Sequence, residues 1–103
     1  MNEKQFSQSV VDLAHTLGWK VYRTWSSIHS PAGYPDLFMV HEETKRAIAA
    51  ELKVRDKRGR MGDLTAEQYE WLMLLQEAGI NSYLWTSDDL IEEIAEILLG
   101  GKA

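Results

Sequence analysis

Two short apolar segments, residues 37–40 and 47–53, are separated only by residues 41–46, which are mostly charged and turn-forming. Apolar segments of this length are typical of strands, and so short a connection favours their pairing as an antiparallel hairpin. The hairpin constrains the rest of the chain, because every other element must pack on a sheet that contains these two neighbouring strands.

Three further segments have apolar residues at helical spacing and follow a residue that can cap a helix. They are residues 3–17 after Asn2, residues 66–78 after Thr65, and residues 88–99 after Ser87. In the second of these helices we expect Leu72, Leu75 and Ala78 to lie on the buried face. Aromatic and β-branched residues predict two more strands, over residues 19–25 and 82–85.

The predicted order is therefore helix, three strands, helix, strand, helix (α-β-β-β-α-β-α). The helical crossover between strands 47–53 and 82–85 favours a parallel pair, which gives an α/β sandwich with a mixed sheet. A chain of 103 residues, 45% of them hydrophobic, can build one compact core and not two. We therefore expect a single domain over residues 1–103.

Composition argues against several functional classes. The chain has no cysteine, which excludes disulfides, thiolate metal sites and a cysteine nucleophile. No apolar run approaches the roughly 18 residues of a membrane span, and the first residues lack the apolar core of a signal peptide. No Ser-His-Asp set, P-loop or zinc-ligand spacing is present. We expect a cytoplasmic protein with no membrane partner and no nucleotide cofactor.

The formal net charge of −5 disfavours nucleic-acid binding at first sight, but the charge is unevenly distributed. Residues 1–60 hold ten basic and seven acidic side chains, whereas residues 61–103 hold one basic and nine acidic side chains. Four basic residues follow closely after Lys53, namely Arg55, Lys57, Arg58 and Arg60. Such a segment can bind DNA phosphates even in an acidic chain. The alternative is a solvated loop without a partner.

The most informative motif is Gly33-Tyr34-Pro35-Asp36-Leu37, which is followed by Glu51-Leu52-Lys53. Asp36 precedes one strand of the expected hairpin, and Glu51 and Lys53 lie two apart on the other strand. Their side chains therefore leave the same face of the sheet. Because the strands are antiparallel, the start of the first meets the end of the second. We expect two carboxylates and one ammonium group to converge there.

This combination suits metal-dependent phosphodiester chemistry. Two neighbouring carboxylates repel each other, and Mg²⁺ removes that repulsion while keeping positions for water and phosphate. Lys53 can hold the phosphate, orient the attacking water or stabilise transition-state charge, and the backbone carbonyl of Leu52 can add a metal ligand. The alternative is a plain surface ion pair between Glu51 and Lys53, which is the usual meaning of an isolated Glu-x-Lys sequence.

The ordered set of motifs resembles the PD-(D/E)XK nuclease superfamily, and more closely its virus-type replication and repair nuclease group (VRR-NUC) in the stand-alone phage and bacterial form. The matching residues are Glu3, Gly18-Trp19, Gly33 to Leu37, Glu51 to Lys53, Gln68, Trp71, Ala78-Gly79 and Trp85. The resemblance covers nearly the whole chain. It implies a restriction-endonuclease-like core and a phosphodiesterase that depends on Mg²⁺ or Mn²⁺.

The resemblance also implies residue roles and partners. Asp36 and Glu51 would bind the metal, with Glu3 as a further ligand, directly or through water. Lys53 would be the catalytic lysine, and Gln68 would position water, metal or Lys53. Stand-alone members of the group are expected to form homodimers and to act on branched DNA such as four-way junctions.

Three of the candidate residues, Gln68, Glu3 and His29, have an equally simple structural explanation. Gln68 can complete a capping box with Thr65, and a glutamate such as Glu3 suits the start of any helix. Gln8 lies further along the first helix and can point into the same cleft. His29, in the loop before the motif, can contact phosphate, although a loop histidine is usually only solvated.

We therefore predict a metal-dependent, structure-selective DNA endonuclease, with the four-way (Holliday) junction as a candidate substrate. A monomer of this size has little surface with which to hold a junction, whereas a two-fold dimer would place two sites across it. One alternative is a non-catalytic DNA-binding module of the same fold, which we would expect to lack Asp36, Glu51 or Lys53. Another is a restriction-type endonuclease, for which the chain is short.

Overall fold

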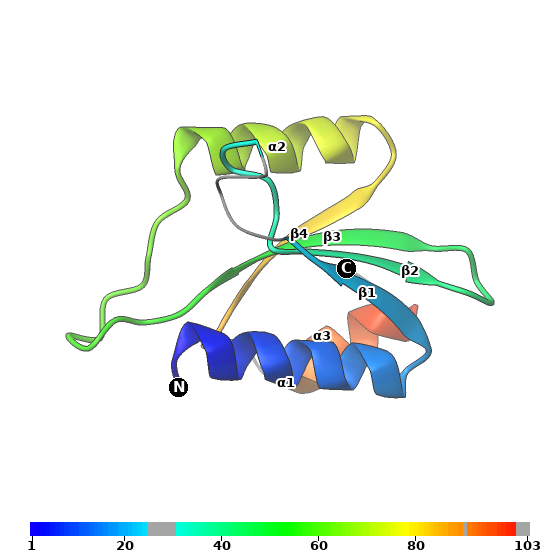
Figure 1. Cartoon of the computed structure of the whole chain (residues 1–103), viewed down its shortest axis with the longest axis horizontal. Helices are drawn as coiled ribbons and strands as arrows, with labels where there is room; N and C mark the ends of the chain where they lie inside the picture. The colour runs from blue at the N-terminus through cyan, green and yellow to red at the C-terminus, as the bar shows by residue number, and fades with distance from the viewer. Residues whose placement is uncertain (25–30, 90, 101–103) are drawn as a thin grey trace.

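A mixed four-stranded sheet forms the centre of the molecule in a computed structural model that describes residues 1–24, 31–89 and 91–100. The strands lie in the order β1 (Trp19–Arg23), β2 (Leu37–His41), β3 (Ala47–Lys53) and β4 (Asn81–Thr86). The first three strands are antiparallel, and β4 pairs with β3 in parallel (Figure 1). Both the predicted hairpin and the predicted parallel crossover are confirmed.

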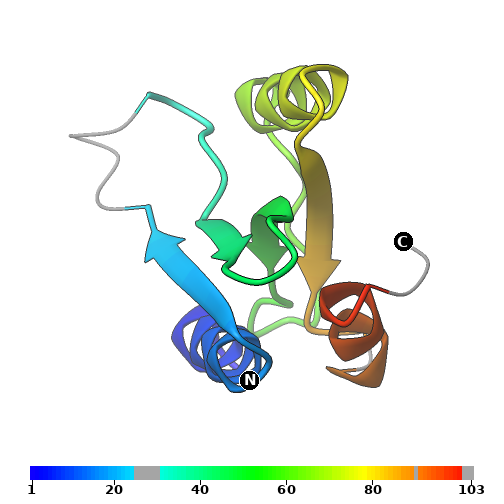
Figure 2. The ribbon, with the colours of Figure 1, turned by 90° about the vertical axis from the view of Figure 1, so that its right-hand side faces the viewer.

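Three helices cover the two faces of this sheet. They are α1 (Glu3–Thr16), α2 (Ala66–Glu77) and α3 (Ile91–Leu98). Figure 1 shows α2 on one face and both α1 and α3 on the other, and Figure 2 shows α1 beneath β1 and α3 at the end of β4. The element order is the predicted α-β-β-β-α-β-α, and none of the helices in the described residues is long and apolar enough to cross a membrane.

The first two helices begin as their capping residues predict. Asn2 Oδ1 accepts the Gln5 N–H over 2.8 Å, and Gln5 Oε1 in turn accepts the Asn2 N–H over 2.9 Å. Thr65 and Gln68 make the same reciprocal pair at the start of α2. Such a capping box satisfies two backbone donors that no helical carbonyl can reach.

Several of the predicted helix and strand limits differ from those in the structure. The third helix does not begin after Ser87, because residues 87–89 form a turn in which Asp89 Oδ2 accepts the Thr86 N–H over 2.7 Å. Aspartate side chains that bind nearby backbone in this way compete with helix formation. Ala78 caps α2 and is exposed, not buried. The first strand ends at Arg23, and the predicted strand residue Trp25 lies outside the described residues.

The core lies mainly between the sheet and the pair α1 and α3. Phe6, Val10 and Ala14 face it from α1, and Ile94 faces it from α3. The central strand β3 is covered on both faces, so that all five residues from 48 to 52 are buried. One of them is a carboxylate, and a charged group in such a place needs a specific partner or a shifted pKa.

Candidate active site

The β2–β3 register brings the two motif carboxylates together. Leu37 pairs with Ala50, so Asp36, the residue before Leu37, lies beside the residue that follows Ala50, which is Glu51. Asp36 Oδ2 accepts the Leu52 N–H over 2.9 Å. This bond places the Asp36 side chain against the main chain between Glu51 and Lys53, as the predicted convergence requires.

The end of β1 holds the Asp36 main chain in this position. Thr24 donates its N–H to the Asp36 carbonyl over 2.9 Å, and its hydroxyl donates to the Pro35 carbonyl. Thr24 was not identified from the sequence, because a single threonine after a strand carries no signal of its own. Its role depends on the pairing of β1 with β2.

Glu51 lies at the centre of a small polar network. It is only 3% exposed, and its Oε2 accepts a hydrogen bond from Gln68 Nε2 over 3.1 Å. The Lys53 ammonium lies 3.8 Å from the same oxygen and is itself largely covered. The Glu51–Lys53 contact is therefore not the exposed surface ion pair that was the alternative explanation.

Gln68 serves the helix and the carboxylate at once. Its Oε1 accepts the Thr65 N–H over 3.0 Å, and its Nε2 donates to Glu51. The two explanations offered for Gln68 are thus compatible, since the amide has an acceptor for the helix cap and a donor for the carboxylate. The capping box fixes the rotamer that the contact with Glu51 requires.

A close approach between the motif loop and α2 sets the position of Gln68. Gly33 has φ +84°, and a Cβ atom there would lie 2.5 Å from the Glu67 carbonyl carbon and 2.7 Å from the Gln68 nitrogen. Trp71 Nε1 donates to the Ala32 carbonyl over 3.1 Å. Only glycine permits this backbone conformation and this distance together.

Burial and charge act together on Glu51. Removal of the carboxyl from water raises its pKa from an ordinary 4.5 to about 8, and the neighbouring negative charge of Asp36 acts in the same direction. The positive charge of Lys53 only partly offsets these effects. Without a cation, the site therefore favours the protonated form of Glu51 more than water does.

The donor set fits a hard divalent cation. Glu51 Oε1 is buried and has no hydrogen-bond partner within the described residues. A buried unpaired oxygen beside a second carboxylate is a favourable ligand for Mg²⁺ or Mn²⁺, which would also remove the repulsion from Asp36. Over the described ranges, no three His, Cys, Asp or Glu side chains are gathered closely enough to hold a metal ion. The geometry thus favours a two-carboxylate site.

Glu3 and Gln8 occupy different positions relative to this site. Glu3 lines a cavity of about 440 Å³ together with Arg23, Asp36 and Leu52, so it faces the same space as Asp36 without joining it in a three-carboxylate group. Gln8 accepts a hydrogen bond from Arg23 over 2.8 Å and lies outside that lining. His29 lies outside the described residues.

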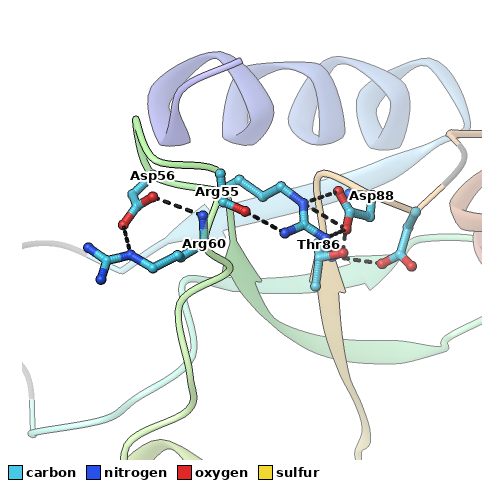
Figure 3. Close-up of polar contacts among 7 residues, drawn as sticks. Arg55, Asp56, Arg60, Thr86 and Asp88 are labelled. Atoms are coloured by element: carbon cyan, nitrogen blue, oxygen red, sulfur yellow. Dashed lines mark hydrogen bonds and ion pairs between the residues drawn. The ribbon is translucent and has the colours of Figure 1, made fainter.

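The four basic residues after Lys53 are not equivalent. Arg55 donates to both carboxylate oxygens of Asp88, at 2.5 to 3.1 Å, and Arg60 Nε donates to Asp56 over 3.1 Å (Figure 3). The bonds with Arg55 lower the pKa of Asp88, and the pKa of Arg55 is raised in return. Asp88 lies 33 residues from Arg55 in the sequence, and no sequence pattern near either residue predicted this contact.

Comparison with known proteins supports the fold. No protein-family model matches the chain, and no curated protein has significant similarity to it. A solved structure described as a VRR_NUC domain protein superposes with a TM-score of 0.69 at 16% identity, over 99% of this chain and 92% of that chain. Archaeoglobus fulgidus Hjc, described as a Holliday junction resolvase, superposes with a TM-score of 0.57 at 20% identity, over 82% and 68%. The chain thus has the restriction-endonuclease-like fold of the VRR-NUC and PD-(D/E)XK nucleases.

Proposed function

We propose that this protein is a metal-dependent deoxyribonuclease that cleaves branched DNA, with the four-way junction as its preferred substrate. The observation that carries the proposal is the meeting of Asp36, Glu51 and Lys53 at one end of the β2–β3 hairpin. The fold shared with a VRR_NUC domain protein and with a Holliday junction resolvase supports the choice of reaction and substrate.

Each residue of the candidate active site has a distinct proposed role. Asp36 and Glu51 would hold Mg²⁺ or Mn²⁺, with the Leu52 carbonyl as a further ligand and Glu3 contributing through water. When bound, the cation supplies charge stabilisation for the phosphate and a more acidic water. Lys53, next to Glu51, binds a non-bridging phosphate oxygen and offsets the negative charge that develops there. Gln68 keeps Glu51 oriented.

Water attack on phosphorus forms one P–O bond and breaks another, and the departing sugar oxygen takes up a proton. A negatively charged phosphodiester is a poor electrophile, so positive charge must lie at the phosphate before attack. A largely covered lysine such as Lys53, beside the Glu51 carboxyl, meets that requirement better than an exposed one, because solvent screening is weaker there.

The experiment is a cleavage panel with the purified chain. Single-stranded, duplex, flap and four-way-junction DNA of matched sequence are incubated with Mg²⁺, with Mn²⁺ or with EDTA. We expect metal-dependent cleavage of the junction in preference to the linear duplex. Equal cleavage of one fixed sequence in every substrate would indicate a restriction-type enzyme, and binding without cleavage under all metal conditions would indicate a non-catalytic DNA-binding module.

A further inference from the structure

The segment that follows β3 is a small ordered hairpin. Arg55 and Met61 form an isolated antiparallel bridge, and the Asp56 N–H donates to the Arg60 carbonyl over 2.8 Å. The turn closes through Gly59, which has φ +78° and donates its N–H to the Asp56 carbonyl over 2.9 Å. We call residues 55–61 the basic hairpin.

The turn after β4 anchors this basic hairpin. Asp88 binds Arg55 through both carboxylate oxygens, and Arg55 Nη1 also donates to the Gly59 carbonyl over 2.6 Å. From the same turn, the Ser87 N–H donates to the Lys53 carbonyl over 3.1 Å. One turn thus holds both the residue proposed as the catalytic lysine and the hairpin that follows it. Figure 3 shows the contact between Asp88 and Arg55.

Two basic side chains of the basic hairpin take no part in these ion pairs. Arg55 and Arg60 are each matched by a carboxylate, so they add little net positive charge to the surface. The side chains of Lys57 and Arg58 are exposed and make no hydrogen bond or ion pair with any residue that the structure describes. The unbalanced charge of the basic hairpin therefore lies at its tip.

Two cavities that share Glu3 lie between this tip and the candidate active site. Lys57 lines a cavity of about 480 Å³ together with Glu3, Val54 and Arg55. Glu3 also lines the neighbouring cavity that contains Asp36 and Leu52. A strand with one phosphate at Asp36 and Lys53 can therefore continue along the start of α1 to the tip of the basic hairpin.

We propose that Lys57 and Arg58 bind the phosphates that flank the scissile bond, and that Asp88 is a positioning residue that holds the basic hairpin through Arg55. This assignment rests on the proposed function. It narrows the four basic candidates to two DNA contacts, and it gives Arg55 and Arg60 structural roles.

The first test compares two double variants of equal charge. Lys57→Gln with Arg58→Gln removes the proposed contacts, and Lys20→Gln with Lys45→Gln removes two positive charges from the opposite end of the sheet. Binding of fluorescent junction DNA is titrated at several salt concentrations with Ca²⁺ in place of Mg²⁺. Affinity falls as salt rises, and the first variant should make this dependence shallower, reducing the magnitude of the slope of log affinity against log salt by about 1.8. The control variant should leave the slope nearly unchanged. Equal effects in both variants would overturn the assignment.

The second test asks whether Asp88 positions the basic hairpin or shields Arg55 from DNA. If Asp88 positions the basic hairpin, Asp88→Asn should weaken DNA binding by roughly threefold to fivefold, and Arg55→Gln should have a similar effect. Asp88→Glu keeps the negative charge and should bind DNA nearly as well as the wild type. If Asp88 instead hides Arg55 from DNA, Asp88→Asn should bind more tightly with a steeper salt dependence, which would refute the positioning role. Thermal unfolding of each variant verifies that the fold is intact.

Measurements on the wild-type chain distinguish failure of this inference from failure of the proposed function. A wild-type chain that neither binds junction DNA in Ca²⁺ nor cleaves any substrate with Mg²⁺ or Mn²⁺ contradicts the proposed function, and this inference falls with it. A wild-type chain that binds and cleaves, alongside a Lys57 and Arg58 variant with unchanged affinity and salt slope, contradicts only the assignment of the basic hairpin.

Discussion

Gln68 Nε2 donates to Glu51 Oε2 over 3.1 Å, although the two residues lie 17 positions apart, on α2 and β3. The contact connects the first turn of a helix to the buried carboxylate of the candidate active site. Stability of the helix start and orientation of the carboxylate are therefore coupled, and variants at several positions should affect both.

Asp36 and Glu51 should each be essential for metal-dependent cleavage. Asp36→Asn and Glu51→Gln keep the size of each side chain but weaken metal binding, so we expect activity below about one percent of wild type. Glu43→Gln, an exposed carboxylate change in the 41–46 turn, serves as the matched control and should cleave normally. Circular dichroism checks folding, and near-normal activity in either site variant would contradict the assignment.

Gln68 and Gln5 offer a matched comparison. Both complete a capping box, but only Gln68 contacts Glu51. We expect Gln5→Ala to lower the free energy of unfolding by about 0.5 to 1 kcal/mol, and Gln68→Ala by about 1 kcal/mol more, because it also removes the hydrogen-bond donor from the buried Glu51 carboxyl. Only Gln68→Ala should strongly lower the cleavage rate. Similar rates in the two variants would limit Gln68 to helix capping.

Gly33→Ala should damage both stability and activity. A Cβ atom there meets the α2 backbone at 2.5 Å, and the positive φ adds strain. Gly79→Ala is the control, since Gly79 also has a positive φ but has no atom within 4 Å of its Cβ position. We expect a loss of about 1 kcal/mol for Gly79→Ala and roughly 2 to 4 kcal/mol for Gly33→Ala, measured by urea unfolding. Equal losses would mean that the close approach is relaxed at little cost.

The stability of the metal-free protein should fall as pH rises. The folded state raises the pKa of Glu51 from 4.5 to about 8, so it binds this proton more tightly than the unfolded chain does. The resulting stabilisation is complete below pH 4.5 and is lost as pH rises through about 8, an effect on the order of a few kcal/mol. Unfolding by urea in EDTA at pH 5.5, 7 and 8.5 measures it. Glu51→Gln should lack this component, and an identical pH dependence in both proteins would contradict the pKa shift.

The protein should be a homodimer in solution. A four-way junction presents two cleavage positions, and a two-fold dimer would place one candidate active site at each. Light scattering at micromolar concentration should give twice the 11.8 kDa mass of one chain. If the wild-type protein is monomeric under these conditions and still cleaves four-way junctions, the prediction is refuted.

The sequence was sufficient for most of the secondary structure and for the meeting of the motif residues. Helix caps, apolar periodicity and turn residues act over a few positions, so the seven elements and their order follow from local pattern. The antiparallel hairpin then brings Asp36 and Glu51 to the same end of the sheet, and the observed register places them side by side. Local pattern misplaced the start of α3, because Asp88 and Asp89 form contacts that oppose an earlier start.

The tertiary structure determined how the site residues behave. Burial of Glu51, its raised pKa and its bond with Gln68 require α2 to lie on β3, and α2 is held there partly by the contact of Gly33. Likewise, which basic residues can meet DNA depends on Asp88, far along the chain from Arg55. Sequence pattern reports what a residue's neighbours along the chain favour, whereas desolvation and ion pairing depend on atoms that only folding brings together.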